Sequence, residues 1–201
     1  MPRFVLGIVL LFMAVNFDPV VHAEGDGTIP SAGGQYFDHR VEIPVPVFAQ
    51  DDPRWGNVRL GPSRDTLGDQ GCAVTSAAMV VAFYGVKTDP QQLNSFLTKA
   101  GGLSDDGLIQ WSRVPAIAPS HLELAYNGYA SYELIDSNLL TKNPVIAIIH
   151  LRDGAYHFVV IVGKQGRNYL IRDPAASVFR RPYPLSDLTD RIDGICFFRT
   201  I

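Results

Sequence analysis

The chain has 201 residues, of which 47% are hydrophobic and 18% are charged. This composition excludes a disordered chain and suits one globular domain of roughly 150–180 residues. The formal net charge is −3, and like charges form no block along the sequence. Such a balance argues against a nucleic-acid partner and against a basic membrane-binding face.

The first residues have the pattern of a secretory signal peptide. Arg3 provides a positive start, the apolar run Phe4 to Val15 follows, and the segment ends in Val21-His22-Ala23. This pattern predicts cleavage after Ala23 and export to the periplasm or the extracellular space. The apolar run of 12 residues is short for a membrane-spanning helix of about 20 residues. We therefore expect no stable membrane insertion after cleavage, and an uncleaved anchor is the alternative.

The segments that follow predict a leader, an edge strand and a long loop. Residues 24–40 are rich in glycine and polar residues, so we expect a flexible leader before a domain at 41–201. Val41 to Phe48 alternates apolar residues with two prolines, as an edge strand does. Gln50 then begins a long irregular connection to Cys72, and loops of this length are usually functional or packed by their own side chains.

Four helices are expected before the last strands. The first runs from Cys72 to Gly85 and is polar only at Thr75 and Ser76, which indicates burial on most sides. Thr88-Asp89-Pro90 supplies a cap and a first-turn proline for the second helix. The second, third and fourth helices are expected at 91–99, at 106–112 and, capped by Asp136, at 137–141.

Residues with high β-propensity dominate the second half of the chain. We expect strands at 144–151, 157–163, 168–173 and 195–199. Helices followed by an antiparallel sheet predict an α+β domain. The cysteine helix would then pack against that sheet.

Cys72 follows a glycine at the expected start of the central helix. First-turn N–H groups and the helix dipole favour an anion, so one interpretation is a thiolate nucleophile. The alternative is a small buried cysteine that packs like alanine. Two cysteines in an exported protein often form a disulfide. Cys196, however, lies in a short apolar strand where it would serve as a core residue, so a Cys72–Cys196 bond is the less favoured alternative.

A cysteine nucleophile needs a base, and His157 is the preferred candidate. His150, at the end of the preceding strand, is the competitor. Lys164-Gln165-Gly166 suits a three-residue hairpin loop with a left-handed glycine, and that loop places His157 opposite Asp173. Asp173 would accept the Nδ1 proton and leave Nε2 to face the cysteine. The plain alternatives are a half-buried structural histidine and an Asp-Pro turn.

Acyl transfer also needs donors for an oxyanion. The backbone N–H of Cys72 supplies one, and a glutamine amide from the preceding loop would supply the other. Gln50 is favoured because it begins a long loop that can fold back. Gln70 stays an alternative, although it lies only two residues before Cys72.

Together these segments resemble the papain-fold cysteine peptidases of the bacteriocin-processing, or double-glycine, branch and their exported stand-alone relatives. The resemblance spans about residues 41–199 and is carried by Gln50-x-Asp52-Pro53-Arg54-Trp55, Gly71 to Met79 with Tyr84-Gly85, His157 to Gly163, and Asp173-Pro174. It departs from many relatives at Ala73 and Val74. It implies a papain-like α+β fold with Cys72 as nucleophile, His157 as base, Asp173 as orienting residue and Gln50 as oxyanion donor. It does not extend to the transporter domains of bacteriocin exporters, so cleavage after two glycines is not carried over.

The resulting hypothesis is an exported cysteine peptidase that hydrolyses an amide bond through a thioester on Cys72. Its substrate would be a peptide or protein, with a cell-wall peptide as a narrower option. No cofactor or metal is expected. The alternatives are a cell-wall amidase or transpeptidase with the same triad, a catalytically silent papain-fold module that binds peptides or proteins, and a plain structural domain. Aromatic residues such as Trp55, Trp111 and Tyr126 would line a peptide or glycan groove.

Overall fold

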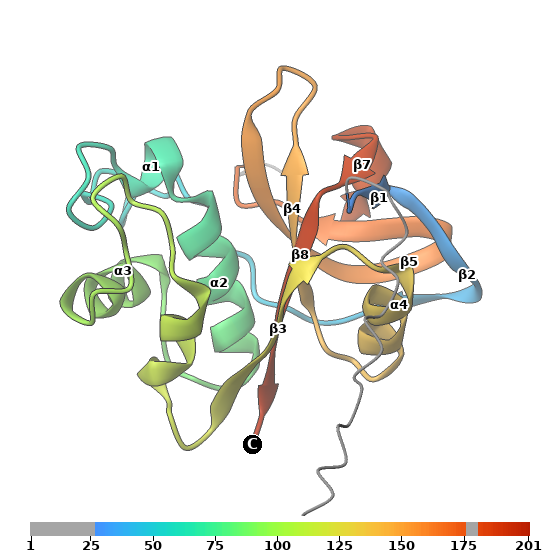
Figure 1. Cartoon of the computed structure of the whole chain (residues 1–201), viewed down its shortest axis with the longest axis horizontal. Coiled ribbons are helices and arrows are strands. Elements are labelled where there is room, and N and C mark those ends of the chain that lie inside the picture. Colours follow the sequence, from blue (N-terminus) through green and yellow to red (C-terminus); the bar gives the residue numbers. More distant parts are fainter. Residues whose placement is uncertain (1–26, 176–180) are drawn as a thin grey trace, which may run out of the picture.

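The protein is described here by a computed structural model, which places residues 27–175 and 181–201 (Figure 1). The expected signal peptide lies outside these ranges. The helices are α1 (Leu67–Gln70), α2 (Cys72–Phe83), α3 (Pro90–Lys99) and α4 (Tyr132–Leu140), with 3-10 helices η1 (Trp111–Ile117) and η2 (Leu185–Asp187). The strands are β1 (Ile29–Pro30), β2 (Ala32–Glu42), β3 (Leu122–Tyr129), β4 (Val145–His150), β5 (Tyr156–Arg172), β6 (Tyr183–Pro184), β7 (Arg191–Ile192) and β8 (Gly194–Thr200). Among these residues no helix is long and apolar enough to cross a membrane.

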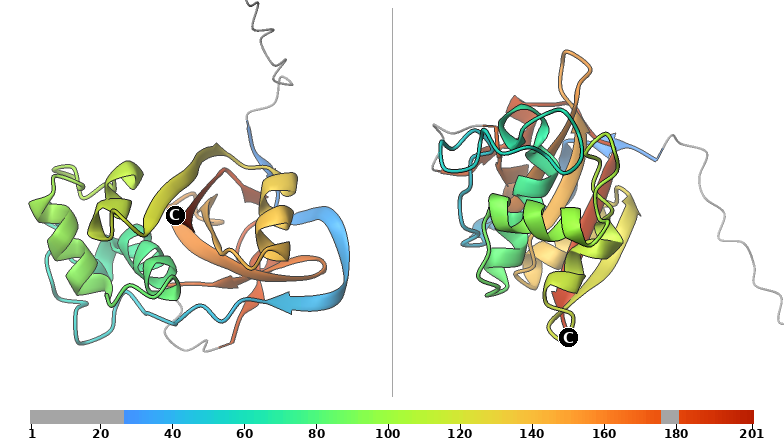
Figure 2. Two further views of the ribbon diagram at one scale, coloured as in Figure 1. Left: turned by 90° about the horizontal axis from the view of Figure 1, so that it is seen from below. Right: turned by 90° about the vertical axis from the view of Figure 1, so that its left-hand side faces the viewer.

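A helical half and a sheet half lie side by side (Figures 1 and 2). The main sheet has the order β2-β5-β4-β8-β3 and its pairs are antiparallel. Helix α2 packs against β5, and the Ser76 hydroxyl donates to the Phe158 carbonyl over 3.1 Å. The expected α+β fold, with the cysteine helix on an antiparallel sheet, is confirmed.

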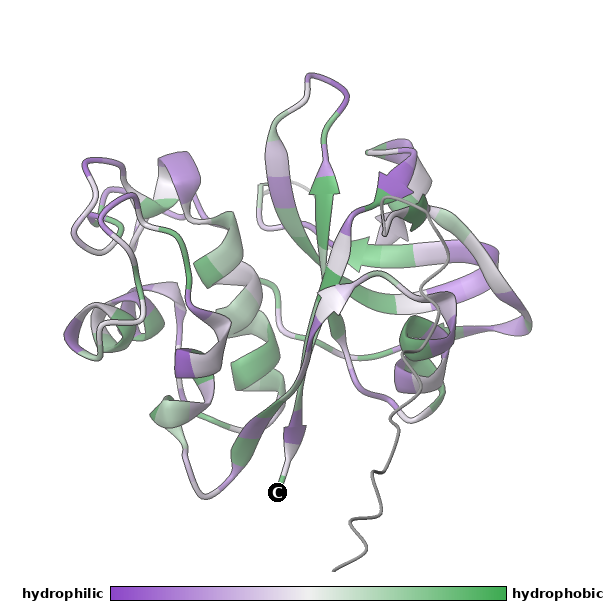
Figure 3. Ribbon diagram, viewed as in Figure 1, coloured by the Kyte–Doolittle hydropathy of each residue, from purple (hydrophilic) through white to green (hydrophobic). Residues whose placement is uncertain are grey.

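The core continues through both halves. Every residue of α2 from Val74 to Val81 is buried, and so are the residues of β4 from Val145 to Ala147. Figure 3 shows the hydrophobic colouring of α2 and β4 where the two halves meet. Helix α4 lies on the other side of β4 and β8 from α2 (Figures 1 and 2). The sheet is therefore covered by helices from two sides, which fixes α2 firmly in place.

Strand β5 folds back on itself, and this turn shapes the sheet half (Figures 1 and 2). Gly166 has φ 60° at the turn, the left-handed conformation expected for the glycine of a three-residue loop. Strand β2 runs around the outside of the turn and pairs with it from Ala32↔Asn168 to Glu42↔Gly163. Because the outer strand covers a longer path, its register shifts twice, on either side of Phe37.

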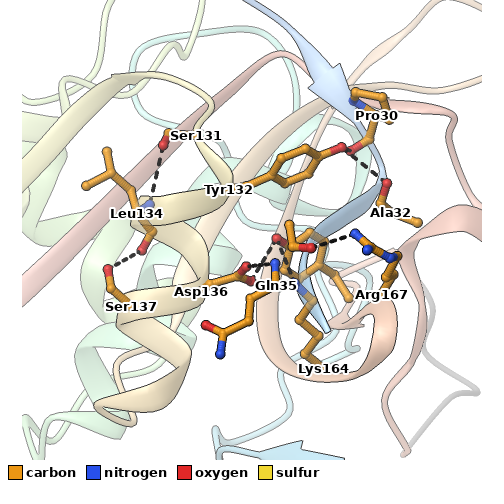
Figure 4. Close-up of polar contacts among 12 residues, drawn as sticks. Pro30, Ala32, Gln35, Ser131, Tyr132, Leu134, Asp136, Ser137, Lys164 and Arg167 are labelled. Carbon is orange, nitrogen blue, oxygen red and sulfur yellow. Dashed lines mark hydrogen bonds and ion pairs between the residues drawn. The ribbon is translucent and has the colours of Figure 1, made fainter. Parts of the chain in front are cut away.

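A buried polar cluster fastens β2 and α4 to β5 (Figure 4). Lys164 is fully buried and its Nζ lies 2.6 Å from Asp136 Oδ1, which also accepts from the Tyr169 hydroxyl over 2.9 Å. The other oxygen, Asp136 Oδ2, accepts from the Gln35 backbone N–H over 2.7 Å. Burial lowers the pKa of Lys164 despite its hydrogen bond to Asp136. A buried charge of this kind is tolerated because each partner is hydrogen-bonded.

The expectation of a flexible leader at 24–40 is wrong for the residues that form the paired strands β1 and β2. The glycines that indicated flexibility instead allow close packing. A Cβ at Gly33 would collide with the Tyr132 ring, and one at Gly34 with the Asp136 carboxylate. Gly34 also has φ 66°, which favours glycine. Residues 24–26 lie outside the described ranges.

Three other boundaries differ from the expectation. The edge strand placed at 41–48 ends at Glu42, since Pro44 and Pro46 follow and cannot donate to a ladder. The third helix, expected at 106–112, is the 3-10 helix η1, which contains Pro115. The fourth helix is α4, which begins at Tyr132 after a Ser131 cap, so Asp136 is internal rather than a cap. Strand β3 was not predicted from the sequence.

Candidate active site

Cys72 is the first residue of α2, the helix that packs against β5 of the sheet half. Gly71 precedes it, and a Cβ there would collide with the backbone of Leu67. The first N–H groups of α2 have no carbonyl of their own helix to bind, so they provide partial positive charge beside the sulfur. Cys72 is partly exposed and free, whereas Cys196 is buried, free and has its pKa raised by burial. The less favoured disulfide between them is therefore absent, and only Cys72 is accessible.

His157 and Asp173 are brought together by the fold-back of β5. His157 Nε2 lies 2.7 Å from Asp173 Oδ1, and the two side chains are 7% and 6% exposed. Burial alone would lower the pKa of His157, but hydrogen bonds to Asp173 and Cys72 outweigh it and raise the pKa from 6.5 to about 9. Burial would raise the pKa of Asp173, yet its bonds to His157, Tyr183 and Ala175 hold it below the usual value. The contacts of the pair therefore favour a protonated His157 beside an ionised Asp173.

The ring nitrogens of His157 are used in the opposite order to the one expected. Nε2 faces Asp173, which leaves Nδ1 for the contact with Cys72. Helix α2 packs directly on β5, so Cys72 is reached by the nitrogen nearer the histidine backbone. Asp173 stands across the fold-back and meets the distal nitrogen. Either nitrogen can exchange a proton with a thiol when the other is held, so the chemistry is unchanged.

Two hydrogen bonds hold Gln50 in place, and one of them joins it to Gly68, which lies four residues before Cys72. Its side-chain Nε2 donates to the Gly68 carbonyl over 2.8 Å. Its backbone N–H donates to the Pro174 carbonyl, also over 2.8 Å. Gln50 is 8% exposed, and its Oε1 has no partner among the described residues. One amide hydrogen is used by Gly68, so the second is available to an oxyanion formed beside Cys72.

The loop that carries Gln50 is held by its own side chains. The Trp55 indole N–H donates to the Ala49 carbonyl over 2.7 Å, and its ring meets Phe48 edge-on at 5.8 Å. Asp52 and Arg54 form a two-pronged ion pair that lowers the pKa of Asp52 to about 2. Thus the expected irregular loop exists and is ordered by local contacts.

Comparison with known proteins agrees with this arrangement. Residues 42–191 match the model of the Peptidase_C39 like family. The chain belongs to this family. The fold is similar to the crystal structure described as that of a C39-like peptidase from Bacillus anthracis, with a TM-score of 0.54 and 17% sequence identity over 80% of this chain and 98% of that one. A search of curated proteins gave no match. The chain is therefore a cysteine-type peptidase of the C39-like kind, as the resemblance in its sequence indicated.

Other residues considered from the sequence occupy different places in this C39-like peptidase. His150 pairs with Asp193 through Nδ1 at 3.0 Å instead of facing Cys72. Gln70 is exposed beside Cys72. Of the three aromatic residues expected in a groove, Trp111 lines a pocket at Cys72. Trp55 is buried in the Gln50 loop, and Tyr126 stacks on Phe197 in the sheet.

Sequence reasoning missed one residue of the C39-like site, Tyr183. Its hydroxyl donates to Asp173 Oδ2 over 2.7 Å, while the Ala175 backbone N–H donates to Oδ1 over 2.8 Å. Burial and the neighbouring Asp173 raise the pKa of Tyr183, so it stays a neutral donor. Nothing in the local sequence indicates this contact, because Tyr183 reaches Asp173 by pairing β6 with the end of β5.

Proposed function

We propose that this protein is an exported cysteine peptidase that hydrolyses a peptide bond through a thioester on Cys72. The observation that carries the proposal is the position of His157, hydrogen-bonded to Cys72 on one side and to Asp173 on the other, with its pKa raised to about 9. In the proposed reaction this histidine carries the proton that the sulfur gives up. A thiolate paired with imidazolium is the activated nucleophile of cysteine-dependent acyl transfer.

Each residue then has a defined role in the reaction. The Cys72 sulfur attacks the substrate carbonyl carbon, and the C=O π pair moves onto oxygen. The Cys72 backbone N–H and the Gln50 amide hold that oxyanion. His157 gives its proton to the amine as the C–N bond breaks, which leaves an acyl thioester. His157 next takes a proton from water, which hydrolyses the thioester and returns the sulfur to its starting state.

Export is proposed from the first residues of the sequence. The positive start, the short apolar run and the ending Val21-His22-Ala23 support removal of a signal peptide. The mature chain would then begin at Glu24 and act in the periplasm or outside the cell on a peptide or protein. Intact-mass analysis of the protein recovered from those fractions tests this, since a retained Met1 would contradict it.

The test of the catalytic proposal is alkylation of Cys72 by iodoacetamide as a function of pH. We expect rapid reaction at about pH 6.5, where an ordinary thiol is almost wholly protonated. His157→Ala should slow it at least about tenfold, because the thiolate loses its cationic partner. His39→Ala is the control, since it removes an exposed histidine of β2 and should leave the rate unchanged.

Peptide mapping by mass spectrometry separates Cys72 from Cys196, whose buried thiol should react only on unfolding. A Cys72 that is inert near pH 6.5, or that ignores the loss of His157, would contradict the peptidase mechanism. Such a result would favour a silent peptide-binding module.

A further inference from the structure

A pocket of about 230 Å³ borders Cys72. Both halves of the molecule contribute to it, and most of its lining is apolar. The lining residues are Leu60, Asp65, Gln70, Cys72, Ala73, Asp106, Gly107, Leu108, Ile109, Trp111, Tyr156 and Phe158. At roughly 30 Å³ for each water, the volume would hold about eight waters.

The floor of the pocket is rigid. Trp111 is 8% exposed and its ring lies 5.6 Å from that of Phe158. Leu60 is 2% exposed. These side chains belong to the core of the helical half and to β5, so the floor exists before a substrate arrives.

The rim of the pocket exposes two large apolar side chains from opposite halves. Leu108 and Tyr156 are each 68% exposed. Large apolar groups left in water beside a nucleophile mark a surface that a ligand covers. Because Tyr156 immediately precedes His157, this side of the rim belongs to β5, the strand that carries the catalytic histidine.

Both rim residues are held in place by their surroundings. The His150 ring lies 4.0 Å from the Tyr156 ring, and His150 is fixed by Asp193 at 3.0 Å. Leu108 sits in a tight turn, in which its carbonyl accepts from the Ser104 N–H and its own N–H donates to the Ser104 hydroxyl, both over 3.0 Å. A prebuilt rim loses little conformational entropy on binding.

The place of the pocket identifies which part of a substrate it receives. The leaving amine must lie over His157 to accept its proton, and His157 does not line the pocket. Cys72 lines the pocket, as do Tyr156 and Phe158 on either side of His157, but His157 itself does not, and this favours the acyl side of the scissile bond. Two carboxylates, Asp65 and Asp106, line it and no basic side chain does, so an acidic residue would be repelled.

We propose that this pocket, with Leu108 and Tyr156 as its specificity-determining rim, selects a bulky apolar side chain, such as leucine or phenylalanine, at one of the two residues before the scissile bond. The proposal rests on the proposed function. It distinguishes this chain from an enzyme that requires two glycines. It also disfavours cell-wall peptides rich in alanine and glutamate, which would leave the pocket unfilled or carry the repelled charge.

Peptidyl chloromethyl ketones test the proposal without a known substrate. The Cys72 sulfur displaces chloride and forms a C–S bond, so the rate reports how well the peptide is placed. We would compare acetyl-dipeptide reagents in which leucine, phenylalanine, glycine or glutamate occupies either of the two positions. Leucine or phenylalanine at one position should raise the rate at least about tenfold over glycine, and glutamate should be slowest.

Variants of the rim give the matched comparison. Leu108→Ser and Tyr156→Ala should each reduce the leucine-to-glycine rate ratio at least about threefold. Leu140→Ser, an equally drastic change at an exposed leucine of α4, should leave the ratio unchanged. Iodoacetamide, which has no side chain to place, should react with Leu140→Ser at the wild-type rate, and the rate of each rim variant with the peptide reagents is divided by its own rate with iodoacetamide.

These experiments distinguish a failure of the pocket proposal from a failure of the peptidase proposal on which it rests. If iodoacetamide labels Cys72 but glycine reagents react as fast as leucine reagents, the pocket proposal is wrong and the peptidase proposal stands. If the rim variants change the rates of all reagents alike, the pocket does not select the side chain. If iodoacetamide also fails to label Cys72, both proposals fail together.

Discussion

At the scale of single residues, the site combines a thiol, an imidazole, a carboxylate and an amide in distinct environments. His157 and Asp173 are nearly buried, whereas Cys72 is partly open to solvent. Burial strengthens the interaction between the imidazole and the carboxylate. Exposure leaves the sulfur accessible to a substrate. The buried pair of His157 and Asp173 therefore activates the thiol, while the partial exposure of Cys72 lets a substrate reach it.

The two glutamines near Cys72 can be separated by mutation. Gln50→Ala should lower kcat about 100- to 1,000-fold, because it removes one of two donors to the oxyanion. Gln70→Ala should lower it less than about threefold, because Gln70 is exposed and only borders the pocket. Steady-state hydrolysis of a peptide substrate measures both.

Iodoacetamide labelling provides the control for the glutamine comparison. Alkylation forms no oxyanion, so Gln50→Ala should label at the wild-type rate while its peptide hydrolysis falls. If instead Gln70→Ala carries the larger loss of kcat, the assignment of the donor would have to be reversed.

At the scale of secondary-structure elements, the parts that the sequence predicted correctly are those with local causes. Helix α2 follows from one apolar run. The closeness of His157 and Asp173 follows from the glycine turn within β5, where Gly166 adopts the left-handed conformation that the local sequence predicts. The order of the His157 nitrogens was not predictable, because it depends on how closely α2 packs on β5.

Strand β2 was missed because its causes are distant in sequence. Gly33 and Gly34 look like a flexible leader until Tyr132 and Asp136, about a hundred residues later, are seen to pack on them. Asp136 was likewise assigned to a cap because its partner, Lys164, is brought to it only by the folded sheet. Local propensity carries no information about such contacts.

Alanine substitution at two matched glycines tests the anchoring of β2. Gly34 and Gly101 have φ 66° and 64°, so alanine suffers the same backbone strain at both, about 1 kcal/mol or slightly more. Nothing lies near a Cβ at Gly101, whereas one at Gly34 would collide with the Asp136 carboxylate.

Gly34→Ala should therefore lower the free energy of unfolding by about 3 kcal/mol or more, because it also disturbs a buried ion pair. Gly101→Ala should lower it by about 1 kcal/mol. Urea denaturation measures both. Equal losses would mean that β2 is not held by the Asp136 cluster.

At the scale of the whole molecule, the active site is also a junction between its two halves. Cys72 comes from the helical half, while His157 and Asp173 come from the sheet half. The Gln50 loop bonds to both, through Gly68 and Pro174. The charge state of the site should for this reason be linked to the stability of the complete fold.

This linkage predicts how stability depends on pH. The pKa of His157 is about 9 in the folded protein and about 6.5 in the unfolded chain. Because the folded value is higher, its stabilising contribution is fully present below about pH 6.5 and is lost as the pH rises through about 9. The full contribution is about 3 kcal/mol. The pKa of Asp173 is lowered by the same pair, so its contribution is lost only in acid, below its ordinary value of 3.8.

Urea denaturation at about pH 6 and about pH 9.5 tests the prediction. The wild-type protein should lose about 3 kcal/mol more between these pH values than His157→Gln, which has no charge to lose. Cys196 contributes its own loss at high pH, because its thiol is kept neutral only in the fold, but it does so equally in both proteins. Parallel pH dependences for the two proteins would mean that the folded state does not hold His157 as an imidazolium. In that case neither the stability of the junction nor the activation of Cys72 could be attributed to an ion pair.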